Sequence, residues 1–135
     1  MKINPSLIKA ELLWENPNQN NNSGFVGQYI QNITNLPNYS YIILVWKNNY
    51  YQQHGATAVP LLHVDKFQKQ VNENSSSFGF FGSDYFAQRY FRVSDDTTIA
   101  FENCNQAIFS SSGTTFNQDN HCCIPVAVYG TNYLV

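Results

Sequence analysis

The sequence predicts an all-β protein with the fold of an antiparallel β-sandwich, jelly-roll-like, built from seven to eight short strands. Three observations lead to this prediction. Runs of alternating apolar and polar residues recur along the chain, segments rich in Asn, Ser and Gly separate them, and no window has the i, i+3, i+4, i+7 apolar spacing of a helix. A chain of 135 residues suffices for one domain with its own hydrophobic core. We therefore expect an N-terminal arm at 1–10 and a sandwich domain at 11–135.

The strand-like segments are bounded by turn-forming residues on both sides. The segment 40–47 is apolar on both faces, which is typical of a central strand. In 57–64, Pro60 favours an edge strand or a bulge because proline has no backbone N–H to donate. The segment 64–74 is the best candidate for a helical turn or a loop. In chain order the predicted strands are 10–16, 25–33, 40–47, 57–64, 85–93, 97–103 and 123–130.

Polar segments between these strands are predicted as turns and loops. Two of them, 73–83 and 110–120, are long and rich in Ser, with Gly in each. Within the predicted strand 85–93, only Arg89 breaks the apolar alternation. The predicted turns and loops are 16–24, 35–38, 48–55, 73–83, 94–96 and 110–120.

Charge and composition argue against several classes of function for this chain. The formal net charge is −2 and the seven Lys and Arg residues are scattered, so no cationic face for nucleic-acid phosphates is expected. Charged residues make up 12%, about half the usual share, and 18 Asn with Gln, Ser and Thr supply the polarity instead. The longest apolar stretch, 41–46, is far too short to span a membrane, and residues 1–14 lack the pattern of a signal peptide. We expect neither a nucleic-acid partner nor membrane insertion.

The segment 119–130, DNHCCIPVAVYG, holds most of the residues that are capable of chemistry. Three Cys residues are an odd number, which argues against a disulfide framework. Consecutive side chains of a strand point to opposite faces, so the His-Cys-Cys triplet is not expected to converge on one metal ion. We predict a turn shaped by the side chains of Asp119 and Asn120, followed by the last core strand. Neither a metal nor a cofactor is expected.

Recognisable catalytic motifs are missing from the sequence. A G-x-S-x-G nucleophile elbow does not occur, and the three His residues lie far apart. Glycoside hydrolysis needs two carboxylates close together, and Glu11 and Glu15 are explained more simply as charges at the ends of the first strand. We predict that the protein is not an enzyme and has no catalytic residues. A small hydrolase such as a polysaccharide depolymerase is the least favoured alternative.

Aromatic residues make up a high 16% of the chain. Rings beside amide and hydroxyl groups suit sugars, because the C–H face of a sugar stacks on a ring while its hydroxyls form hydrogen bonds. Aromatic residues in the predicted loops are therefore the candidate glycan or receptor contacts, and packing in the core or in a subunit interface is the alternative. They are Tyr50, Tyr51, Phe78, Phe80, Phe81 and Tyr85.

Several stretches of the chain together resemble a known group of proteins. A Leu-Trp-x-Asn-Pro opening at Leu13–Pro17 is followed by the apolar strand Tyr41–Trp46 and by closing pairs near the C-terminus. Those pairs are Asp119 with Asn120, Ile124 with Pro125, and Tyr129 with Gly130. In this order they resemble a β-rich domain of bacteriophage and prophage virion proteins, often found at the C-terminal end of tail or minor structural proteins. The resemblance covers residues 11–133.

This resemblance implies a structural protein of the virion, as a component of a tail fibre, a head fibre or the capsid surface. It implies attachment to host-surface glycans, contact with other virion proteins, and a homo-oligomer with a trimer favoured. The arm at 1–10 would then dock to the particle or to a neighbouring subunit. Localisation in the virion, after synthesis in the host cytoplasm and release by lysis, agrees with the missing signal peptide. The alternative from another class is a monomeric carbohydrate-binding module without a structural role.

Overall fold

Nine β-strands and one short 3₁₀ helix make up the regular secondary structure of the described residues. The structure is a computed structural model, and it describes residues 10–20, 23–48, 54–60 and 76–132. The elements are β1 (Glu11–Glu15), β2 (Gln28–Ile30), η2 (Leu36–Asn38), β3 (Tyr41–Lys47), β4 (His54–Pro60), β5 (Ser76–Phe81), β6 (Tyr85–Asp95), β7 (Thr98–Ser110), β8 (Gly113–Gln118) and β9 (Ile124–Thr131).

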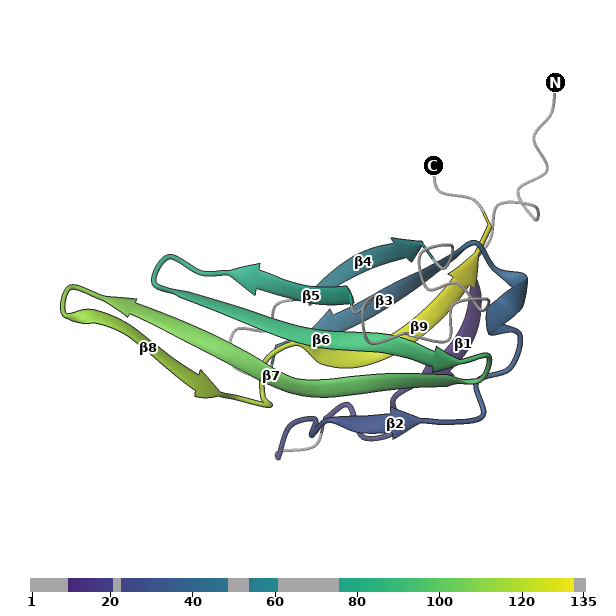
Figure 1. Ribbon diagram of the computed structural model, residues 1–135, viewed down its shortest axis with the longest axis horizontal. Coiled ribbons are helices and arrows are strands. Elements are labelled where there is room, and N and C mark those ends of the chain that lie inside the picture. The colour runs from purple at the N-terminus through teal and green to yellow at the C-terminus, as the bar shows by residue number, and fades with distance from the viewer. Residues whose placement is uncertain (1–9, 21–22, 49–53, 61–75, 133–135) are drawn as a thin grey trace, which may run out of the picture.

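The strands form two antiparallel sheets that lie face to face (Figure 1). One sheet has four strands in the order β1-β9-β3-β4, and the other has five, in the order β2-β7-β6-β5 with β8 added beside β7. Because β7 is 13 residues long, β2 pairs with its first part and β8 with its second part. Both lie on the edge of β7 that faces away from β6. The predicted antiparallel β-sandwich is confirmed.

The hydrophobic core lies between the inner faces of the two sheets. On β3, Ile42 and Leu44 are completely buried, and on β6 the inward positions include Ala87 and Phe91. Val128 on β9 closes the core from the same sheet as β3. Burying one such large side chain contributes about 1.5–3 kcal/mol. Since side chains alternate between the two faces of a strand, the face that carries the apolar residues packs toward the other sheet.

The central strands follow the predicted pattern with two differences. β3 does lie between β9 and β4, but the side chains on its outer face, including Ile43 and Val45, are half-buried and not fully covered. On β9, Ala127 pairs with Val45 while Pro125 pairs with Trp46, so Val126 is an extra residue in a β-bulge. The bulge changes the alternation, and Ala127 and Val128 are consecutive buried residues.

Two segments predicted as turns are strands in the structure. β5 lies within 73–83 and β8 lies within 110–120, which raises the strand number above the predicted seven to eight. Their Ser, Thr and Gly residues have loop-like propensities, but β6 and β7 supply antiparallel hydrogen-bonding partners along their whole length. Pairing with a neighbouring strand therefore outweighs local propensity.

Other boundaries of the predicted elements also shift. The strand predicted at 57–64 begins earlier, at His54, and the part beyond Pro60 lies outside the described residues. Of the strand predicted at 25–33, only β2 forms. The helix or loop predicted at 64–74 and the arm predicted at 1–10, apart from Ala10, lie outside the described residues. In the part of the chain that the structure describes, no helix is long and apolar enough to cross a membrane.

Candidate functional site

The structure describes four of the six aromatic residues that were predicted as ligand contacts. Tyr50 and Tyr51 lie outside the described residues. Phe78 on β5 and Tyr85 on β6 are buried strand residues, and Phe80 is half-buried and packed against the core. These three rings thus lie on strands and not in exposed loops, and a role for them in ligand contact stays a prediction.

Phe81 is the remaining member of that set, and it is exposed. It ends β5 with 76% of its surface accessible, and its ring lies 4.6 Å from the ring of Phe86, measured between centroids. Both residues lie on the outer face of the five-stranded sheet, because they are partners in the β5–β6 ladder and the neighbouring positions point inward. A role for Phe81 in ligand contact stays a prediction.

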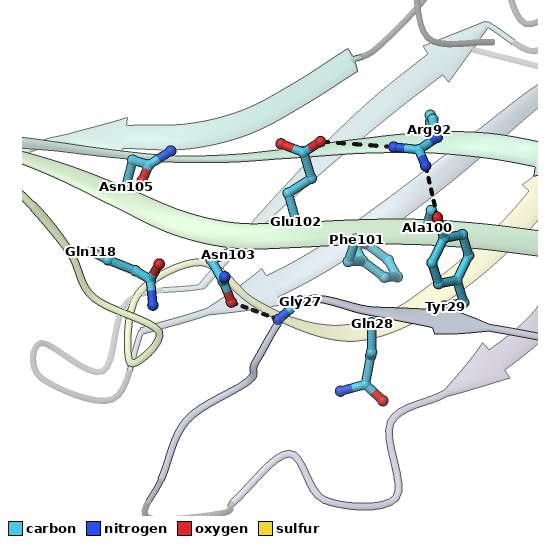
Figure 2. A pocket seen from close by; sticks show the side chains of 10 residues that line it. All are labelled: Gly27, Gln28, Tyr29, Arg92, Ala100, Phe101, Glu102, Asn103, Asn105 and Gln118. Atoms are coloured by element: carbon cyan, nitrogen blue, oxygen red, sulfur yellow. Dashed lines mark hydrogen bonds and ion pairs between the residues drawn. The ribbon is translucent and has the colours of Figure 1, made fainter.

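A different part of the molecule forms an open polar groove of about 520 Å³. It lies on the edge of β7 between Phe101, which pairs with the first residue of β2, and Asn105, which pairs with the last residue of β8. Figure 2 shows Tyr29 and Arg92 at one end of the groove, Asn105 and Gln118 at the other, and Asn103 between them. The ten lining residues are Gly27, Gln28, Tyr29, Arg92, Ala100, Phe101, Glu102, Asn103, Asn105 and Gln118.

The aromatic end of the groove is held by contacts among Tyr29, Arg92 and Glu102. The guanidinium of Arg92 lies over the Tyr29 ring, 5.8 Å from its centroid, and donates a hydrogen bond of 3.0 Å to the Tyr29 hydroxyl. Its other terminal nitrogen lies 3.7 Å from a carboxylate oxygen of Glu102. Tyr29 itself is 59% exposed. The groove thus presents the Tyr29 ring in a fixed orientation, and the positive charge of Arg92 beside it is balanced by the carboxylate of Glu102.

The middle of the groove is fixed by a network of asparagine side chains. Oδ1 of Asn103 accepts hydrogen bonds from the Gly27 N–H at 2.8 Å and from Nδ2 of Asn120 at 3.1 Å. Oδ1 of Asn120 accepts the N–H of Cys104 at 2.9 Å. With the carbonyl end of Asn103 used in this way, its amide NH₂ group is the part left for a ligand.

Behind the groove, Arg89 is a completely buried arginine on β6. It donates hydrogen bonds to three backbone carbonyls: Nη1 to Glu102 at 2.6 Å, Nε to Cys123 at 2.8 Å and Nη2 to Cys122 at 3.2 Å. Its guanidinium also lies over the Phe25 ring, 5.2 Å from the centroid. Burial lowers the pKa of Arg89. The side chain joins the backbone under the groove to the segment that precedes β9.

That segment, DNHCCI, forms the predicted turn and then enters the last strand. Oδ1 of Asp119 accepts the N–H of His121 at 3.0 Å, and the side chain of Asn120 joins the network described above. Cys123 has a left-handed backbone with φ 50°, and its N–H donates to Oδ1 of Asn48 at 2.7 Å. The prediction of a turn shaped by local side-chain hydrogen bonds is confirmed for Asp119, whereas the side chain of Asn120 bonds to β7 instead. β9 begins directly after Cys123.

The three cysteines are free thiols buried in the core, and two of them have a raised pKa. Burial raises the pKa of Cys122 to about 12. The pKa of Cys123 is raised by its hydrogen bond with the Cys104 thiol and by burial, and the same hydrogen bond lowers the pKa of Cys104. Among the described residues, no group of three or more His, Cys, Asp or Glu side chains is arranged to hold a metal ion.

The raised pKa of Cys122 predicts a loss of stability at alkaline pH. Above its ordinary value of 9.0, the thiol loses its proton in the unfolded chain but keeps it in the folded protein, up to about pH 12. The unfolded state then binds fewer protons, so the free energy of unfolding falls as pH rises, by about 1 kcal/mol at pH 10. Urea unfolding between pH 7 and pH 10 measures this fall. It should be smaller in Cys122→Ala, and an equal fall in both proteins contradicts the assignment.

Of the six aromatic residues predicted from the sequence as ligand contacts, none of the four that the structure describes lines the groove, and the reason is recognisable. Tyr29 and Arg92 lie in predicted strands. The alternation of apolar and polar residues predicts which side chains of a strand face the solvent, but not where those side chains form a groove. One signal was present: Arg89 is the single charged residue at an inward position of β6, and a buried arginine requires a cluster of acceptors around it. The glycan-contact search followed loops, whereas the groove is built on strand residues.

Fold and groove together define an antiparallel β-sandwich with a polar groove at an interruption along one sheet edge. Comparison of the chain with known protein families, with curated proteins and with solved structures finds no match.

Proposed function

We propose that this protein is a glycan-binding β-sandwich and that the groove between β2 and β8 is its ligand site. One observation carries the proposal: an exposed, oriented Tyr29 ring adjoins a row of amide side chains on the same sheet edge. A sugar can stack its C–H face on the ring, and its hydroxyls can pair with the amides of Asn103, Asn105 and Gln118. Amides donate and accept, as hydroxyls do, and so match them without a net charge.

The charges of the groove favour a neutral ligand. Among the described residues that line it, Arg92 and Glu102 are the only charged ones, and they lie beside each other. A phosphate or a polyanion would require uncompensated cations, and a cationic ligand would require an acidic wall. The uncharged hexose or N-acetylhexosamine units of a polysaccharide fit this composition better than either.

We further propose that the binding serves attachment of a virion to its host, as the resemblance to bacteriophage structural proteins implies. A β-sandwich presents its loops and sheet edges to the outside, and a groove on such an edge can take an internal segment of a long polysaccharide. In this proposal the protein is a component of a tail fibre, a head fibre or the capsid surface, together with other virion proteins.

Replacing Tyr29 tests the proposed site directly. The purified protein is screened on an array of neutral and acidic glycans, and the best neutral glycan is then titrated by calorimetry. Tyr29→Ala is expected to weaken the binding at least about tenfold, since stacking on an aromatic ring and its partners is worth roughly 1–2 kcal/mol. Tyr90→Ala is the matched control because Tyr90 is a partly exposed tyrosine of the same sheet that does not line the groove.

Three results would count against the proposal. These are the absence of binding to any glycan, a preference for acidic glycans, and equal binding by wild type and Tyr29→Ala. Phe81→Ala separates the groove from the earlier candidate: a loss in this variant alone places the contact at the end of β5, as first predicted from the sequence.

A further inference from the structure

β8 is an exposed edge strand of the five-stranded sheet. All six of its residues are exposed, and among the described strands it pairs only with β7 (Figure 1). A strand in this position leaves half of its backbone N–H and C=O groups without a partner strand, which is a template for adding another strand.

The side of β8 on which these groups lie follows from one hydrogen bond. The N–H of Phe109 on β7 donates to the carbonyl of Asp84, next to β6, at 2.7 Å. The backbone N–H and C=O groups of successive residues in a strand point to opposite sides. The backbone groups of Ile108 therefore point toward β8, and those of its partner Thr115 point back toward β7. The residues of β8 whose backbone groups point to the free edge are therefore Thr114, Phe116 and Gln118.

The usual protections of an edge strand are missing from β8. Residues 105–118 include no charged residue and no proline. By contrast, β1 carries Glu11 and Glu15, and β4 ends at Pro60. Phe116, in the middle of the unprotected edge, is the most exposed large hydrophobic residue of the described chain, at 79%.

We propose that β8 pairs with β8 of a second copy of this chain, antiparallel and across a two-fold axis at Phe116. In this register Phe116 lies opposite Phe116 of the second copy, and Thr114 lies opposite Gln118 of the second copy. Every residue with a free backbone edge then meets another such residue. The two five-stranded sheets join into one continuous sheet, and the Phe116 rings become neighbours on one face.

The absence of charge identifies a second copy as the occupant of this edge. In a two-fold interface the same strand faces itself, so a charged residue near the axis would meet its own charge. An uncharged strand avoids this repulsion, and residues 105–118 meet that condition over their whole length. The pairing also places the β7–β8 turn of the second copy beside Gln118, at one end of the groove.

Charge placed at Phe116 tests the pairing. Sedimentation velocity or light scattering over a concentration series should show a dimer of the 15.4 kDa chain. F116K and F116E are each expected to weaken dimerisation at least about tenfold, since like charges then lie directly opposite. An equimolar mixture of F116K and F116E should recover the dimer, because opposite charges then meet, and this recovery also shows that both variants are folded.

The control is F81K, which changes a similarly exposed phenylalanine on β5, at the opposite edge of this sheet. It should dimerise like the wild type. A wild type that is monomeric at every concentration overturns the proposal, and so does a trimer, which a two-fold edge contact cannot form. Loss of the dimer in F81K instead of F116K overturns it as well, by placing the interface on β5.

Discussion

Replacing Arg89 with methionine is expected to lower the free energy of unfolding by about 3–5 kcal/mol. Methionine fills much of the same volume but leaves the buried carbonyls of Cys122 and Cys123 and the part-buried carbonyl of Glu102 without this donor. Each unsatisfied buried acceptor costs about 1–3 kcal/mol. The lower part of the summed range applies because carbonyls tolerate the loss of one partner better than N–H groups do.

Urea unfolding of the wild type, Arg89→Met and two further variants measures this effect. Arg89→Lys keeps the charge but gathers all its donors on one nitrogen, so we expect a stability between those of the wild type and Arg89→Met. Arg92→Met is the matched control, an arginine on the same strand with an ion pair at the surface, and should cost at most about 1 kcal/mol. If Arg89→Met is as stable as Arg92→Met, Arg89 does not hold this part of the core together.

Gly24→Ala is expected to destabilise the protein by roughly 2–4 kcal/mol, for two reasons that add. Gly24 has φ +78°, a left-handed conformation that costs a residue with a Cβ about 1–2 kcal/mol. That Cβ would also lie only 2.3 Å from the backbone oxygen of Asn120. The same oxygen accepts a hydrogen bond from the N–H of Phe25, which connects the segment before β2 to the turn before β9. Relieving the clash would therefore also disturb this hydrogen bond.

Gly113→Ala separates the two causes. Gly113 has φ +133°, but a Cβ there would meet no other atom within 4 Å. The loss of unfolding free energy in Gly113→Ala should reflect backbone strain alone and stay at about 1–2 kcal/mol. Thermal or urea unfolding of both variants gives the comparison. Equal losses would show that the contact between Gly24 and Asn120 is not tight in the folded protein.

The strands that were predicted correctly share one physical property. β1, β3, β6 and β9 lie close to their predicted ranges, and β7 covers its predicted range from Thr98 onward and extends to Ser110. Each has a face that packs inward, and such a face leaves a period of two in the sequence. The part of the turn that Asp119 shapes was also predictable, because its carboxylate accepts the N–H of His121, two residues further on.

β5 and β8 could not be recognised in the same way. β8 has no buried face at all, so no hydrophobic period marks it, and its Gly, Thr and Asn residues are those of a loop. In β5, two of the three aromatic residues that were predicted as loop contacts, Phe78 and Phe80, are rings that pack near Trp46, with centroids 6.3 Å and 5.8 Å from its ring. Both become strands because β6 and β7 offer them an open edge for pairing.

Sequence by itself thus determined the fold class, the central strands and the local turn before β9, since burial of one face and local hydrogen bonding are properties of neighbouring residues. Tertiary structure alone decided the groove and the free edge. Tyr29, Arg92, Asn103 and Gln118 come from four strands and meet only because β2 and β8 share one edge of β7. Which ring is exposed, which arginine is buried and which strand lacks a partner all depend on what lies across the sheet, and strand order is set by contacts between residues far apart in the chain.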